Sequence, residues 1–124
     1  GAGEAGRIRL LAMAARRKNL RHFQIVAGAV LQRYRLRIDY YNRGRDDIST
    51  RELSPQRLAY YRDNWYLDAW CHEKKALRIY AVECIRAVEP LAKAAKNVLG
   101  YPGRYPRGFG RHPRAGSIER LIAE

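Results

Sequence analysis

Apolar residues in the first third of the chain recur at helical spacing. The first stripe follows i, i+3, i+4, i+7 and comprises Ile8, Leu11, Ala12 and Ala15. The second stripe comprises Phe23, Val26, Ala27, Val30 and Tyr34. We therefore expect a short amphipathic connector helix with a basic outer face, followed by a second helix that packs against a sheet.

At Arg35 the period of the pattern changes from helical to alternating, which is typical of a half-buried strand. That strand is "RLRIDYYN", and four more are expected at "ISTREL", "QRLAYY", "NWYLDAWCH" and "ALRIYAVECI". The turns between them are predicted at "NRGRDD", Pro55, Arg62-Asp63-Asn64 and "HEKK". Five short strands with close turns predict a mainly β fold, either a small barrel or a strongly curled sheet, covered by the preceding helix.

The pattern changes again after the fifth strand. Glu89 and Pro90 are predicted to start a third helix, "LAKAAKNVL", which Gly100 ends. The following "YPGRYPRGFGRHPRAG" lacks core periodicity and is expected to be flexible, and "SIERLIAE" can form a final helical turn. We therefore divide the chain into a basic linker helix (1–21), a β domain (22–90) and a C-terminal helix with a Gly/Pro/Arg-rich tail (91–124).

The charge distribution sharpens this division. The chain carries a formal net charge of +13, which favours a polyanionic partner such as nucleic acid. Residues 1–22 hold six basic residues against one acidic one, and residues 91–124 hold seven against two. The middle of the chain holds twelve against nine, so a binding site there depends on how the charges are arranged.

The stretch "NWYLDAWCH" places aromatic side chains on both faces of its strand. Alternation puts Trp65, Leu67, Ala69 and Cys71 on one face, which we assign to the core. The other face carries Tyr66, Asp68, Trp70 and His72. Tyr66 and Trp70 can either stack on a ligand or pack under the helix, and the pattern leaves both options open.

The sequence gives no support for a membrane protein, a secreted protein or an enzyme. No apolar run reaches membrane-spanning length and no secretory signal is present, so a soluble, cytoplasmic protein is expected. Cys71 and His72 are adjacent and face opposite sides of a strand, which excludes a nucleophile–base pair between them. The three histidines lack metal-ligand spacing, and no glycine motif typical of phosphate-binding loops occurs. We therefore predict a protein that is not an enzyme and has no metal or cofactor.

The ordered series "SPQRLAYYRDNWYLDAWCH" and "ALRIYAVECI" resembles the WYL domain of bacterial helix-turn-helix transcription regulators, named for the triplet seen here as Trp65, Tyr66 and Leu67. The resemblance covers residues 22–90. The segment "GRIRLLAMAARR" is similar to the linker that joins such a domain to an N-terminal winged helix-turn-helix.

The resemblance implies a fold, a function and partners. It implies an Sm-like β-barrel that senses an effector, either single-stranded DNA or RNA or a nucleotide-like ligand, and couples it to transcriptional control. It also implies a homodimer, a helix-turn-helix domain N-terminal to this chain, and a nucleoid-associated location.

The family's ligand face is basic and aromatic, and Arg78 with Tyr80 matches its arginine and following aromatic. The ligand-binding residues predicted on this basis and from charge are Arg51, Arg57, Tyr60, Tyr61, Tyr66 and Arg78. Arg104, Tyr105, Arg107 and Arg111 are predicted nucleic-acid contacts of the tail.

The sequence also departs from the family. It contains no helix-turn-helix, it has Glu83-Cys84-Ile85 where many relatives have Asp-Arg-Ile, and its tail does not resemble their C-terminal extension. Two alternatives therefore stay open. One is a dimerisation or docking module whose basic arms bind nucleic acid nonspecifically, and the other is a stand-alone Sm-like RNA-binding protein.

Overall fold

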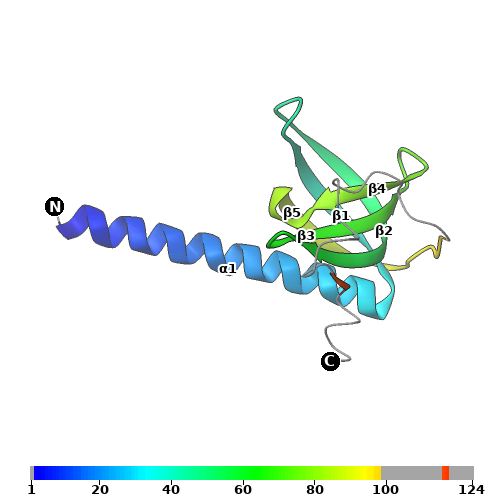
Figure 1. Ribbon diagram of the computed structural model, residues 1–124, viewed down its shortest axis with the longest axis horizontal. Helices are drawn as coiled ribbons and strands as arrows, with labels where there is room; N and C mark the ends of the chain where they lie inside the picture. The colour runs from blue at the N-terminus through cyan, green and yellow to red at the C-terminus, as the bar shows by residue number, and fades with distance from the viewer. Residues whose placement is uncertain (1, 99–115, 118–124) are drawn as a thin grey trace.

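One long helix precedes a strongly bent antiparallel sheet (Figure 1). The computed structural model describes residues 2–98 and 116–117. Helix α1 (Ala2–Gln32) is continuous, so the expectation of two separate helices is wrong. Most residues between the two stripes are Arg, Lys or Leu, which are good helix formers, and no Gly or Pro interrupts them, so the helix continues. No described helix combines the length and the apolarity that a bilayer crossing needs.

The sheet follows the chain order closely. Its strands are β1 (Tyr34–Asn42), β2 (Asp47–Tyr61), β3 (Asn64–Cys71), β4 (Ala76–Ala81), β5 (Ile85–Ala94) and the short β6 (Gly116–Ser117). The order is β4-β3-β2-β1-β5, and β6 pairs with β2. Within the described residues β4 and β5 remain the two ends of the sheet. The predicted mainly β fold behind a helix is confirmed, whereas closure into a barrel is not.

Strand β2 runs through Pro55, where the sequence predicted two separate strands. Its first half pairs with β1 and its second half with β3, so that Leu53 lies opposite both Leu36 and Cys71. The register shifts between Pro55 and Arg57, which places a bulge at Gln56. Proline is tolerated in strands at such irregularities because no ladder donor is needed there.

The end of the predicted fifth strand and the predicted third helix are both wrong. The expected strand is broken by a 3-10 turn, η1 (Val82–Cys84), after which β5 begins at Ile85. β5 then continues through Pro90 to Ala94 along the open edge of β1, so these residues are extended. Pairing with β1 overrides the helical propensity of "LAKAA", and Pro90 is compatible with an edge strand.

The core lies between α1 and the inner face of the sheet. Its largest fully buried side chains include Leu36, Ile38, Leu53, Leu58 and Leu67, and α1 contributes Val26 and Val30. The predicted burial of Leu67, Ala69 and Cys71 is confirmed, whereas Trp65 is half-buried. Trp65 packs against Phe23 of α1 with ring centroids 5.1 Å apart. The C-terminal half of α1 is therefore anchored on the sheet.

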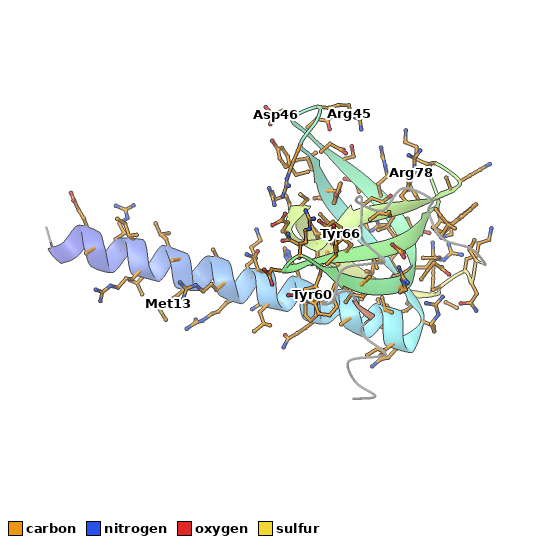
Figure 2. All side chains as sticks on the ribbon, viewed as in Figure 1. Met13, Arg45, Asp46, Tyr60, Tyr66 and Arg78 are labelled. Carbon is orange, nitrogen blue, oxygen red and sulfur yellow. The ribbon has the colours of Figure 1, made fainter. Side chains whose placement is uncertain are left out.

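The N-terminal half of α1 extends well past the sheet (Figure 1). Ile8 and Leu11 of the predicted connector stripe are 67% and 63% exposed, and Met13 on this arm is also exposed (Figure 2). The apolar stripe of α1 therefore continues past the sheet, and no described residue covers its N-terminal part.

Residues 95–98, which follow β5, are held to β2 by hydrogen bonds. The Lys96 amide donates to the Ser54 hydroxyl over 2.8 Å, and the Val98 amide donates to Gln56 Oε1 over 3.0 Å. Ser54 Oγ also lies 2.8 Å from His72 Nε2, and burial lowers the pKa of His72. Neutral His72 can accept from the Ser54 hydroxyl, which then accepts from Lys96. Ser54 itself is fully buried.

Ser54→Ala is expected to lower the free energy of unfolding by about 1–3 kcal/mol, because it leaves the partly buried Lys96 amide and His72 imidazole without this hydrogen-bond partner. Chemical denaturation followed by far-ultraviolet circular dichroism measures the loss. Ser49→Ala is the matched control, since the Ser49 hydroxyl accepts a single side-chain hydrogen bond within the described residues, from Asn42 near the β1–β2 turn. Equal effects of the two changes would contradict the bridging role of Ser54.

Candidate anion-binding face

Two arginines share the inner face of the sheet with the core. Arg51 on β2 lies opposite Ile38, and Arg78 on β4 lies opposite Ala69. Directly opposed residues of antiparallel strands point to the same face. Both arginines therefore lie on the face that carries Ile38 and Ala69, which is the face that curls around the core.

Two tyrosines link the strands across this inner face. Tyr40 of β1 and Tyr80 of β4 meet edge to face, with ring centroids 5.0 Å apart. The amide of Ala81 donates to the Tyr40 hydroxyl over 3.0 Å. β1 and β4 are not neighbours in the sheet, so these contacts show how far it curls.

The charges of Arg51 and Arg78 both affect the pKa of the Tyr80 hydroxyl. It is 6% exposed, and burial is the main cause that raises its pKa, followed by its hydrogen bond with the Cys71 side chain. The positive charges of Arg51 and Arg78 oppose this rise. The two guanidinium groups thus both affect the pKa of one buried hydroxyl on the inner face.

Several other strand arginines are paired with carboxylates. The pairs are Arg35–Glu52 at 2.9 Å, Arg37–Glu89 at 3.4 Å and Arg57–Asp68 at 3.2 Å. Among the described residues Arg51 and Arg78 form no such pair, and Arg51 donates only to the carbonyl of Thr50 over 3.0 Å. Their charges are therefore available to an anionic ligand.

Arg57 lies on the opposite face from Arg51. It pairs with Asp68 of β3, whose side chain is 1% exposed. The six-residue separation from Arg51 would put both on one face of a regular strand, but the bulge at Gln56 shifts the alternation by one. Arg57 is thus separated from the inner face by a feature that the sequence pattern did not reveal.

The three predicted stacking tyrosines also lie away from Arg51 and Arg78. Tyr61 is buried and packs in a small cluster with Ala59 and Tyr66 on the outer face. Tyr66 is half-buried, and burial raises its pKa. Tyr60 packs on Trp65 with ring centroids 5.3 Å apart.

Figure 2 shows Tyr60 beside α1, Tyr66 over the middle of the sheet and Arg78 well away from both. The six predicted ligand residues therefore fall in three places. The predicted tail contacts Arg104, Tyr105, Arg107 and Arg111 lie outside the described residues.

The sequence reading missed two polar features of the sheet. One is the contact of Tyr40 with Tyr80, which depends on curling of the sheet that the pattern does not encode. Asp68 was expected on the open face, yet it is buried, and among the described residues its Oδ1 atom has no hydrogen-bond partner. Its burial depends on tertiary packing, for which the strand pattern gives no signal.

The family model for the WYL domain matches residues 21–90, more than half of the chain. The chain belongs to the WYL domain family. This WYL chain is 31% identical over 70 residues to Protein PafC of Mycobacterium leprae (strain TN), covering 56% of the chain and 22% of that protein.

A solved structure supports the same grouping. The chain matches the proteasome accessory factor B/C (PafBC) of Arthrobacter aurescens with a TM-score of 0.59 and 27% identity. The match covers 63% of this chain and 12% of that one. The WYL chain thus spans less than a quarter of each of these two relatives.

Proposed function

We propose that this WYL domain is the effector-sensing module of a transcription regulator and that its inner face binds the phosphates of single-stranded nucleic acid or of a nucleotide-like ligand. The observation that carries the proposal is the pair Arg51 and Arg78, which share one face and have no carboxylate partner among the described residues. Guanidinium groups form strong, charge-assisted hydrogen bonds with phosphate.

The route from ligand to regulator runs through α1 in this proposal. The inner face and α1 share one core, and His22 Nδ1 lies 3.2 Å from the carbonyl of Ile85 at the start of β5. A ligand that binds more tightly to one curvature of the sheet would shift the position of α1 on the sheet. The exposed half of the helix would pass that shift to a helix-turn-helix domain N-terminal to it, with residues 1–21 as linker and 22–90 as sensor.

Fluorescence anisotropy of labelled single-stranded DNA, single-stranded RNA and duplex DNA across a salt series tests the proposal. We expect both single strands to bind more tightly than the duplex, because a curled face can accept a flexible backbone that a rigid duplex cannot present. Equal binding of all three with a steep salt slope would instead indicate nonspecific adhesion through the basic arms.

A docking role is the second candidate, and the exposed stripe on α1 favours it. Ile8 and Leu11 continue the apolar face that packs on the sheet, yet they lie on the arm beyond it. We propose that this stripe contributes to a homodimer. Size-exclusion chromatography with light scattering separates a monomer, a dimer and the larger ring that an Sm-like RNA-binding protein would form.

A further inference from the structure

Helix α1 carries a second apolar stripe, on the side away from the core. Its members, all between 45% and 68% exposed, are Leu10, Met13, Leu20 and Leu31. At about 100° per residue, Met13 and Leu31 lie roughly 140° around the helix from Val26, which packs on the sheet. Figure 2 shows Met13 on the side of the helix that faces away from the sheet. This stripe is therefore separate from the one that Ile8 and Leu11 form.

The spacing of this second stripe follows the heptad of a coiled coil. Its a and d positions, which we call the outer seam, are Leu10, Met13, Arg17, Leu20, Gln24, Ala27 and Leu31. All but Arg17 and Gln24 are apolar, and the series covers three heptads, a length at which such a pattern indicates a coiled-coil interface. Polar residues at single a positions fix the register of a coiled coil and lower its stability without abolishing it.

The flanks of the outer seam carry charge of one sign. Positions e and g decide which helices pair in a coiled coil. The charged residues at these positions of α1 are Arg7, Arg9, Arg16 and Arg21. All four are exposed, and no acidic residue occupies an e or g position of α1. A helix that docks on the outer seam therefore meets a basic border on both sides.

A second copy of this chain is a poor partner for the outer seam. In a parallel pair, Arg16 at g of one helix faces Arg21 at e of the other helix. In an antiparallel pair, g faces g and e faces e, which again brings arginines together. Like charges at these positions disfavour association, so the complementary flanks are acidic.

We propose that the outer seam is the docking site for an amphipathic α-helix of a partner protein that has an apolar a/d seam and Asp or Glu at its flanks. Such a helix buries its apolar side chains against Met13 and Leu20 and places carboxylates beside Arg16 and Arg21. The site lies on the side of α1 away from the sheet, so it is distinct from the effector face and from the stripe proposed for the homodimer.

Fluorescence anisotropy with a labelled four-heptad peptide tests this docking site on the full chain at about 0.15 M salt. The peptide has leucine at a and d and glutamate at e and g. The same peptide with lysine at e and g controls for the sign of the charge. The glutamate peptide in scrambled order controls for attraction to the chain's net charge of +13. We expect the ordered glutamate peptide to bind at least about tenfold more tightly than either control.

Met13→Ala with Leu20→Ala is expected to weaken binding of the glutamate peptide about 100-fold, because two apolar contacts at the centre of the seam are lost. Ile8→Ala with Leu11→Ala is the matched control, since these residues are also exposed on α1 but lie outside the seam. It should leave the affinity unchanged. Alanine preserves helix propensity, and far-ultraviolet circular dichroism checks that both variants keep the helix.

Reversing the flanking charges provides a second, independent test. Arg16→Glu with Arg21→Glu is expected to exchange the preference, so that the lysine peptide binds and the glutamate peptide does not. Lys18→Glu with Lys74→Glu reverses as many charges at exposed positions outside e and g, on α1 and in the β3–β4 turn. This control variant should keep the preference of the parent chain.

Three results would overturn the inference. The first is equal binding of the ordered and scrambled glutamate peptides, and the second is an equal effect of the two alanine pairs. The third is a dimer of the parent chain that Met13→Ala with Leu20→Ala abolishes in light scattering, which would make a second copy the occupant. Anionic lipid vesicles that bind through Met13 and Leu20 while the glutamate peptide does not would equally contradict it. None of these variants changes Arg51 or Arg78, so failure here is separate from failure of the effector site.

Discussion

The double change Arg51→Ala and Arg78→Ala is expected to weaken single-stranded DNA binding by about 100-fold, from two charge-assisted hydrogen bonds of about 1.5 kcal/mol each. Both side chains lie on the inner face and have no carboxylate partner among the described residues, so their removal leaves no buried charge behind. The melting temperature should therefore change little. Fluorescence anisotropy and a thermal melt provide the two readouts.

A second double variant controls for bulk charge. Arg37→Ala with Arg45→Ala also removes two positive charges, from exposed residues that pair with Glu89 and Asp47. We expect this variant to lose at most a few-fold in affinity, through weaker long-range attraction. If both double variants lose affinity equally, the inner face has no special role and net charge alone explains binding.

Asp68→Asn is expected to stabilise the domain at neutral pH. This is unusual for a substitution that removes the charge of one partner of a buried ion pair. Burial raises the pKa of Asp68 to about 6 from an ordinary value of 3.8, although the charge and hydrogen bond of Arg57 oppose the rise. Because the folded state holds this proton more tightly, Asp68 favours folding most at low pH. That contribution is lost as pH rises from about 4 to about 6, and amounts to about 3 kcal/mol.

Urea denaturation at pH 4, 5, 6 and 7 measures this effect as a difference between the variant and the parent chain. The asparagine variant cannot ionise, so its advantage should be small at pH 4 and greatest at pH 7. Asp39→Asn is the control, since Asp39 is a half-exposed β1 residue that accepts a hydrogen bond from Thr50. A variant less stable than its parent at pH 7 would show that the Arg57 pair outweighs desolvation.

Local patterns in the sequence predicted the parts of the fold that depend on local chemistry. Alternation identified the buried residues Leu67, Ala69 and Cys71 of β3, and Asp63 in the predicted turn tolerates the positive φ observed there. The errors arose where tertiary pairing decides the structure. Nothing local in "LAKAA" reveals that it lies along β1, and nothing in the pattern reveals that Pro55 sits at a bulge inside one strand.

The candidate site shows the same limit. The register places Arg51 and Arg78 on one face of the sheet, and their ligand role stays a prediction. Arg57 was grouped with them, but the bulge at Gln56 turns it to the other face. A one-residue irregularity reverses the direction of every later side chain in the strand, and sequence periodicity cannot detect it.

A nuclear magnetic resonance titration of the ¹⁵N-labelled chain with single-stranded DNA tests the central claim most directly, because it reports which backbone amides sense the ligand. We predict that the largest shifts fall on β2 around Arg51 and on β4 around Arg78, with smaller shifts where α1 meets the sheet. Shifts confined to the N-terminal half of α1 and to residues 99–124, with the inner face unchanged, would contradict it.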